Sequence, residues 1–177
     1  MTFLVPQPSG DNRLVTSFFE VGQYSKPQPS LMPCIDSTLR AIGRWKYLIK
    51  TDLKKAFYQI PLAKSSMRFC GVTTPFKGIR VYTRCAMGMP GSETALEEVM
   101  NRVLGVLVQR GNVAKVADDL YIDGDSPEEA LAVWADVLEA MSNNKLSVSG
   151  PKPIIFTKTT IILGWVRFEG KVKTSHT

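Results

Sequence analysis

The sequence predicts an α+β fold in which an antiparallel sheet packs on helices. Two long segments, 92–111 and 126–144, carry apolar residues at helical spacing. Short runs with β-forming residues lie between and after them, at 46–53, 113–122 and 159–173, with turn residues at their ends. The resulting order of strand, helix, strands, helix, hairpin, helix and strands is typical of an α+β domain.

The first half of the chain is expected to form a strand, a helix and a hairpin. Its first 33 residues are rich in proline and polar residues around "RLVTSFFEV", which predicts a short strand and then an extended segment. Residues 34–43 predict a helix that is capped by Asp36 or Ser37 and ended by Gly43. The β-rich run 46–53 passes into a helical turn at 54–62, and the alternation across 67–85 predicts a hairpin.

The second half contains the two clearest helices. Segment 92–111 has Ser92 as its expected N-cap and Gly111 beyond its end. Segment 126–144 begins with Ser126 as a cap, Pro127 in the first turn and early glutamates. Between them, "VAKVADDLYI" predicts a hairpin with two acids near its tip, and the segments after 144 predict strands joined by tight turns.

The amino-acid composition limits the classes of protein to which this chain can belong. A hydrophobic content of 44% and a charged content of 21% are those of a soluble globular chain. No apolar stretch reaches the roughly 18–20 residues that cross a bilayer, and the N-terminus lacks the pattern of a signal peptide. Three widely spaced cysteines fit buried thiols in a reducing compartment better than disulfides or a zinc site. We therefore expect an intracellular, cytoplasmic protein with no membrane partner.

Charge and histidine content narrow the chemistry. The net charge of +6 favours polyanionic partners, although many proteins that bind none share it. The only histidine, His176, is next to the last residue, which nearly excludes a central histidine base or a His-rich metal site.

Adjacent acids, Asp118 and Asp119, are the unusual feature of this basic chain, and three interpretations compete. A calcium loop over 119–130 fails because Tyr121 and Ala130 stand at ligand positions. A solvated turn is common for such pairs. The third interpretation is a metal site, since Asp52 also ends an apolar strand-like run, where an unpaired charge is costly. Two such strands side by side could share a pair of Mg²⁺ ions about 3.5–4 Å apart. The residues alone leave the last two interpretations open.

Five segments taken in order resemble the consecutive motifs of reverse transcriptases, above all those in the pol polyproteins of LTR retrotransposons and, more distantly, retroviruses. They are "KYLIKTDLKKAFYQIPL", "CAMGMPGSETALEEVMN", "VADDLYI", "NKLSVSGPK" and "TTIILGWVRFEGKV". The resemblance covers roughly residues 5–172. It implies the fingers and palm of a right-hand polymerase, with fingers elements at about 1–35 and 64–86, the palm at about 44–63 and 87–172, and no thumb.

The resemblance also implies a function and partners. The implied reaction is DNA synthesis from dNTPs on an RNA or DNA template, by two-metal phosphoryl transfer from a primer 3′-hydroxyl. The expected cofactors are two Mg²⁺, with Mn²⁺ as the alternative metal. The expected partners are a template-primer, dNTPs and the remainder of a polyprotein that carries thumb, RNase H and integrase. A virus-like particle or the nucleus are the alternatives to a cytoplasmic location.

Site residues follow from the matched motifs. By similarity, the metal ligands are Asp52, Asp118, Asp119 and the backbone of Leu53. The triphosphate would meet the backbone of Leu53 to Ala56, with Lys54 and Lys55 in that run, and Phe57 would exclude a ribose 2′-hydroxyl. Further nucleotide contacts are implied for Arg13, Met87, Gly88 and Lys152, and the primer grip for Leu163, Gly164 and Trp165. Each non-carboxylate residue also has a plain interpretation, as a core aromatic, a turn, an exposed strand or a solvated charge.

Some positions depart from the family pattern. The usual Tyr-x-Asp-Asp has Val116 in place of the tyrosine and Ala117 at the variable position. Ser17 and Phe19 replace the Asp and Arg expected in the first fingers motif, and "PQPSG" lacks the fingertip lysine. Two other functions therefore stay open: an inactive or domesticated nucleic-acid-binding remnant of the palm fold, and an RNA-dependent RNA polymerase, against which Phe57 argues.

Overall fold

The computed structural model describes residues 2–7, 10, 12–74, 76–149, 153–156 and 159–162, and the backbone of 165–168 and 171–174. The chain forms two compact units. The first consists of Met1–Leu31 and Lys55–Glu98, and the second of Met32–Lys54 and Val99–Thr177. Among the described helices, none combines the length and apolar character needed to cross a membrane.

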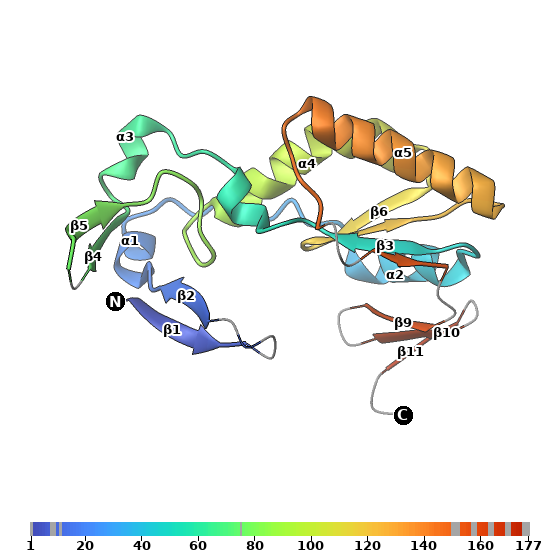
Figure 1. Ribbon diagram of the computed structural model, residues 1–177, viewed down its shortest axis with the longest axis horizontal. Coiled ribbons are helices and arrows are strands. Elements are labelled where there is room, and N and C mark those ends of the chain that lie inside the picture. The colour runs from blue at the N-terminus through green and yellow to red at the C-terminus, as the bar shows by residue number, and fades with distance from the viewer. Residues whose placement is uncertain are drawn as a thin grey trace. The chain divides into compact units, whose positions relative to one another are not determined.

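The first unit contains two separate hairpins and short helices. Strands β1 (Thr2–Pro6) and β2 (Asn12–Thr16) pair antiparallel, as do β4 (Gly71–Thr74) and β5 (Gly78–Val81). Helices α1 (Phe19–Gln23) and α3 (Lys64–Met67), the 3₁₀ turn η1 (Ala56–Gln59) and the start of α4 (Ser92–Gln109) complete it (Figure 1).

A small apolar cluster holds the first unit together. Phe18, Cys70, Ala86 and Met89 are buried in it, and Val21, Leu62 and Tyr82 pack against it. The rings of Phe18 and Tyr82 meet edge to face with centroids 5.5 Å apart, a favourable aromatic geometry. The Tyr82 hydroxyl also lies 2.9 Å from Thr16 Oγ1, so the β1–β2 hairpin is tied to this cluster by a hydrogen bond.

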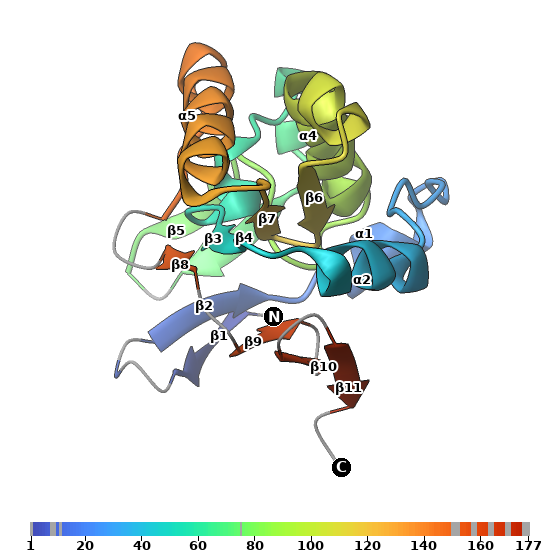
Figure 2. The ribbon, with the colours of Figure 1, turned by 90° about the vertical axis from the view of Figure 1, so that its right-hand side faces the viewer.

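The second unit is built on a four-stranded antiparallel sheet with the order β6-β7-β3-β8. Its strands are β3 (Ile49–Asp52), β6 (Val113–Val116), β7 (Asp119–Ile122) and β8 (Ile154–Ile155). Helix α5 (Pro127–Asn143) lies over one face of this sheet and α2 (Ile35–Arg44) over the other (Figures 1 and 2). Strands β9 (Thr159–Ile162), β10 (Trp165–Phe168) and β11 (Lys171–Thr174) form a separate antiparallel sheet, whose strand β11 contacts α2.

Strand alternation decides which side chains enter each face. On β3, Ile49 and Thr51 are buried on one face, while Lys50 and Asp52 point to the face that α2 covers. A buried cluster fills the α2 side: Leu39, Ile42, Leu48, Ala114, Val116, Tyr121 and Ile162, with Trp45 packed against it. Since Ile162 belongs to β9, this cluster also joins the smaller sheet to the larger one.

Most elements expected from the sequence are present, and several details of the expectation are wrong. Strand β1 and helix α1 were not expected, because Pro6 and a five-residue helix leave little periodic signal. The N-cap of α2 is Cys34, without a side-chain capping bond, and α2 continues through Gly43 to Arg44. Ser126 does cap α5, since its hydroxyl accepts a hydrogen bond from the Glu129 amide at 3.1 Å.

Ser92 does not act as the expected cap of α4. It is the first residue of the helix, it is 2% exposed, and its hydroxyl has no hydrogen-bond partner among the described residues. The serine therefore fills a small buried space at the start of α4.

Candidate functional site: three carboxylates at a strand end

Asp52, Asp118 and Asp119 come together at one end of the four-stranded sheet. Asp52 is the last residue of β3 and Asp119 the first of β7, and the two are direct partners in the antiparallel register. Asp118 precedes β7 in the turn, and its carbonyl accepts a hydrogen bond from the Leu53 amide at 3.0 Å. All three acids are partly buried. Directly opposed residues in antiparallel strands have side chains on the same face, so Asp52 and Asp119 share one side of the sheet.

The hairpin that presents Asp118 has a two-residue turn, Ala117–Asp118, between β6 and β7. Ala117 has φ +53°, a left-handed conformation that a residue with a β carbon adopts at a cost. Buried apolar residues on both strands, Val116 and Leu120 among them, fix the hairpin against the core. The sheet therefore holds the turn in a conformation that alanine alone would not favour.

Asp119 is engaged by two neighbours through the same oxygen. Lys50 Nζ lies 2.9 Å from Asp119 Oδ2, and the Tyr121 hydroxyl donates to this oxygen at 3.1 Å. The Lys50 ammonium also lies 5.5 Å from the centre of the Tyr121 ring. Burial first, and then the negative charge of Asp119, raise the pKa of Tyr121 far above its ordinary value. The tyrosine therefore stays protonated and remains a donor to Asp119.

The donor set at this strand end fits a hard divalent cation. Three carboxylates and the backbone of Leu53 offer only oxygen, which Mg²⁺ prefers. The side chains are not drawn into a tight cage, however: within the described residues no group of three or more acidic, cysteine or histidine side chains has the spacing of a metal site. Asp119 has one oxygen engaged by Lys50 and Tyr121. The residues therefore fit Mg²⁺ by the type of their ligand atoms and by their place in the sheet.

The run after Asp52 changes conformation within a few residues. Leu53 is buried and forms a bridge with Val148, and the Lys54 amide donates to the Ser147 carbonyl at 3.1 Å. Lys55 has φ +49° and directly precedes the 3₁₀ turn η1, in which Ala56 is buried. The side chains of Lys54 and Lys55 are exposed.

Several residues expected to contact the nucleotide meet within the first unit. Phe57, Met87 and Gly88 line one pocket of about 590 Å³, and Arg13 Nη1 lies 3.9 Å from the Met87 sulfur. Gly88 has φ +76°, which explains the need for glycine there. The other lining residues come from 22–28 and 89–94: Gly22, Ser25, Lys26, Pro27, Gln28, Met89, Pro90, Gly91, Ser92, Glu93 and Thr94. Phe57 is thus partly accessible from a pocket and is not a buried core aromatic.

The remaining expected residues are only partly covered by the structure. Lys152, Leu163 and Gly164 lie outside the described residues. Trp165 is described by its backbone, which pairs with Ile162 on β9 and Thr174 on β11.

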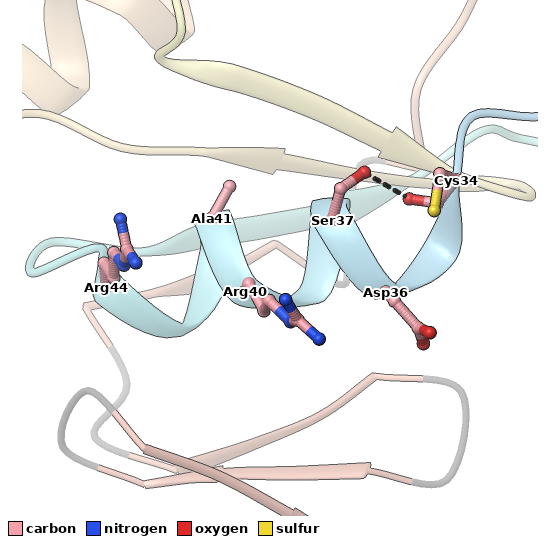
Figure 3. A pocket seen from close by; sticks show the side chains of 6 residues that line it. All are labelled: Cys34, Asp36, Ser37, Arg40, Ala41 and Arg44. Atoms are coloured by element: carbon pink, nitrogen blue, oxygen red, sulfur yellow. Dashed lines mark hydrogen bonds between the residues drawn. The ribbon is translucent and has the colours of Figure 1, made fainter.

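A second pocket, of about 430 Å³, follows the outer side of α2 and contains none of the expected site residues (Figure 3). Cys34, Asp36, Ser37, Arg40, Ala41 and Arg44 line it. The Ser37 hydroxyl donates to the Cys34 carbonyl at 2.8 Å. Hydrogen bonds from the backbone and then the side chain of Ser37 lower the pKa of the exposed Cys34 thiol.

Sequence reasoning missed Lys50 and Tyr121, the two residues that contact Asp119. The two-residue period of a β-strand could have indicated both residues. Lys50 precedes Asp52 by two residues and Tyr121 follows Asp119 by two, so each shares a face with its acid. The spacing within each strand does not predict that β3 pairs with β7, and this pairing brings Lys50 and Asp52 beside Asp119 and Tyr121.

Comparison with known proteins agrees with this architecture. The chain is 26% identical over 148 residues to the Tf2-3 transposon polyprotein of Schizosaccharomyces pombe, a match that covers 84% of this chain and 11% of the relative. The Tf2-7 polyprotein of the same organism matches at the same identity and coverage. The chain thus spans about a ninth of the length of these curated relatives.

Solved structures share the fold. A foamy viral protease-reverse transcriptase in complex with double-stranded DNA aligns with TM-score 0.88 at 20% identity, covering 99% of this chain and 30% of that one. The foamy viral protease-reverse transcriptase in complex with an RNA/DNA hybrid aligns with TM-score 0.85 at 20% identity, covering 99% and 23%. At these identities the likeness establishes the fold, and the family is established by sequence: residues 8–166 match the family model described as reverse transcriptase (RNA-dependent DNA polymerase). The chain belongs to the reverse transcriptase family.

Proposed function

We propose that this chain carries out template-directed DNA synthesis from dNTPs on an RNA or DNA template, by transfer of a nucleotidyl group to a primer 3′-hydroxyl. One observation carries the proposal: Asp52 and Asp119 are direct strand partners, with Asp118 in the adjoining turn. Family membership supports it, since such strand ends hold the carboxylates on which a two-metal polymerase depends.

Asp52, Asp118 and Asp119, with the Leu53 backbone, are the residues that would hold two Mg²⁺, or Mn²⁺ in their place. Bound there, the ions would supply activation of the primer hydroxyl and neutralisation of charge on the phosphates. The sheet fixes the backbone of Asp52 opposite that of Asp119, which limits the reorganisation that these groups need when the substrate arrives. The chain needs no side-chain nucleophile, in keeping with a sequence whose only histidine is His176.

The dNTP would be held by the run from Leu53 to Phe57 and by residues of the first unit. Lys54 and Lys55 are exposed cations suited to a triphosphate, with Lys152 as a further one. Phe57 faces the same pocket as Met87 and Gly88, which supports its role in sensing the sugar. Arg13 contacts Met87 and would lie over the nucleotide.

The wider assignment follows the motifs. We assign segments 1–35 and 64–86 to fingers and 44–63 and 87–172 to a palm, with Leu163 to Trp165 as a primer grip and the thumb outside the chain. By contacts, 55–63 and 87–98 cluster with the first unit. The partners would be a template-primer, dNTPs and the rest of a pol polyprotein, as the Tf2 relatives are polyproteins and the solved relatives were captured with DNA or an RNA/DNA hybrid. The proposed location is the cytoplasm, with a virus-like particle or the nucleus as the alternatives.

Primer extension on poly(rA)/oligo(dT) with dTTP and Mg²⁺ tests the proposal, using this chain and a version extended through a thumb. The variant Asp118→Asn should lower the extension rate about 100-fold or more, the scale of losing one group that stabilises transition-state charge. The matched control is Asp125→Asn, which makes the same chemical change at an exposed acid before α5. Equal activity of the two variants would refute the role given to Asp118.

A second function has an observation in its favour. The acids do not form a tight metal cage within the described residues, and Val116 and Ala117 depart from the family pattern at the turn. A nucleic-acid-binding remnant without turnover would bind template-primer in the presence of Mg²⁺ yet extend no primer in either form of the chain. Extension that depends on Asp118 excludes this function, and extension with rNTPs as readily as dNTPs would point to an RNA polymerase.

A further inference from the structure

The ammonium of Lys50 lies directly on the carboxylate cluster, and three groups hold it. Its nitrogen lies 2.9 Å from Asp119 Oδ2 and donates to the carbonyl of Ile161 at 3.2 Å. It also lies over the ring of Tyr121, at 5.5 Å from the centroid. The Lys50 side chain is 20% exposed and that of Asp119 27%, so solvent screens this pair less than it screens a surface ion pair.

These contacts make Asp119 asymmetric. Its Oδ2 receives both the Lys50 ammonium and the Tyr121 hydroxyl, whereas the hydrogen bonds of Asp119 within the described part of the chain leave Oδ1 to other ligands. Two donors on one oxygen fix the rotation of the carboxylate. Tyr121 is fully buried, so core packing restricts the donor that completes this arrangement.

Lys50 also connects two sheets. Ile161 lies on β9, which pairs with β10, and β10 begins at Trp165. One ammonium therefore bridges the strand end that carries Asp119 and the first strand of the three-stranded sheet.

We propose that Lys50 is a positioning residue of this site. Its ammonium occupies one carboxylate oxygen of Asp119 and links that carboxylate to the backbone of β9; these contacts are called the Lys50 clamp below. This inference rests on the proposed function for its catalytic consequence, although the clamp itself is a property of the protein alone. In this arrangement Asp119 offers a divalent cation a single oxygen, while Asp52 and Asp118 supply the rest of the ligands.

The clamp has opposite effects on metal affinity and on turnover. A positive charge beside the carboxylates opposes a divalent ion. For an ion about 6 Å from the ammonium, even the dielectric constant of water gives roughly a tenfold weaker affinity. The same charge orders Asp119 before substrate binds, which favours turnover. Removing the charge should therefore tighten metal binding and slow catalysis, a combination that simple loss of structure does not produce.

The test combines Mn²⁺ binding to the protein without nucleic acid, followed by electron paramagnetic resonance, with kcat and KM for primer extension. Lys50→Met should bind Mn²⁺ about tenfold more tightly and lose about tenfold or more in kcat. Lys46→Met is the matched control, because it removes the same charge from an exposed lysine whose ammonium lies over the Tyr47 ring, and it should change neither quantity more than about twofold.

Two further variants separate position from charge. Lys50→Arg keeps the charge, so Mn²⁺ affinity should stay near wild type, while a planar guanidinium restores kcat only in part. Tyr121→Phe keeps the charge and the ring and removes one donor to Oδ2, so kcat should fall with little change in Mn²⁺ affinity. Circular dichroism establishes that each variant is folded. Should Lys50→Met fail to fold, Lys50→Arg and Tyr121→Phe decide the matter through the same two readouts.

The outcomes distinguish this inference from the proposed function. If Lys50→Met and Lys46→Met bind Mn²⁺ equally, or if Lys50→Arg and Tyr121→Phe turn over as fast as wild type, the clamp is refuted even when wild type extends primers. If the Mn²⁺ affinities follow the expected order and wild type extends no primer, the proposed polymerase function is refuted and the clamp stands.

Discussion

Replacing Ala117 with glycine should stabilise the second unit, because this alanine is held at φ +53° in the two-residue turn of the β6–β7 hairpin. A left-handed conformation costs an L-residue with a β carbon roughly 1–2 kcal/mol. Glycine avoids that cost but loses more backbone entropy on folding, which returns about 0.5–1 kcal/mol. The expected net change in the free energy of unfolding is therefore about 0.5–1 kcal/mol in favour of the variant, or about 1–4 °C in Tm.

The matched control is the same substitution in a helix. Ala132 is an exposed interior residue of α5, where glycine is expected to cost about 1 kcal/mol. Urea unfolding followed by tryptophan fluorescence suits both variants, because Trp45 packs against the core cluster of the second unit. Identical chemical changes should thus shift the unfolding midpoint in opposite directions. A midpoint that falls for Ala117→Gly as much as for Ala132→Gly would show that the turn stores no strain.

Four further outcomes are expected. Phe57→Val should raise rNTP relative to dNTP incorporation by about 5- to 150-fold, the kinetic equivalent of relieving ~1–3 kcal/mol of overpacking, as single-nucleotide kinetics would measure. Gly124→Ala should destabilise the chain by about 1–3 kcal/mol in urea unfolding, because the added β carbon would lie 2.9 Å from the α carbon of Ala130. Gly105→Ala, where a β carbon meets open space on the helix, should instead stabilise the chain by about 1 kcal/mol. Affinity for template-primer should fall linearly with salt on a log–log plot, and a flat profile would contradict an electrostatic interface. In iodoacetamide labelling followed by mass spectrometry, Cys34 should react at a lower pH than Cys70, because hydrogen bonds lower its thiol pKa while burial raises the pKa of Cys70.

Local features of the fold could be predicted from the sequence because each is decided within a few residues. The β-forming residues of 113–122 and the adjacent acids predict a hairpin with carboxylates at its tip, and β6 and β7 form that hairpin. The early glutamates and Pro127 predict the start of α5, where Ser126 caps the helix. In both cases the signal and the structure cover the same short segment.

The site required information that no local pattern contains. Asp52 and Asp119 meet through the pairing of β3 with β7, strands that are far apart in the sequence. Periodicity placed an acid at the end of each strand but did not decide which strands would be neighbours. The role of Lys50 was hidden for the same reason, because its contacts lie on β7 and β9. Ser92 shows the limit at a helix end, where burial overrides the usual capping preference.

The register between β3 and β7 has a consequence for how this gene can change over time. Because the side-chain period of a strand is two, a slip of one residue would turn Asp52 or Asp119 to the opposite face and bury it against α5. Buried residues such as Ile49 and Leu120 hold the strands in this register, and many apolar side chains serve that purpose equally well. Point substitutions can therefore accumulate in these strands with the carboxylates still opposed. A single inserted or deleted codon would separate them at once, so we expect variation around this site to consist of replacements and not of changes in length.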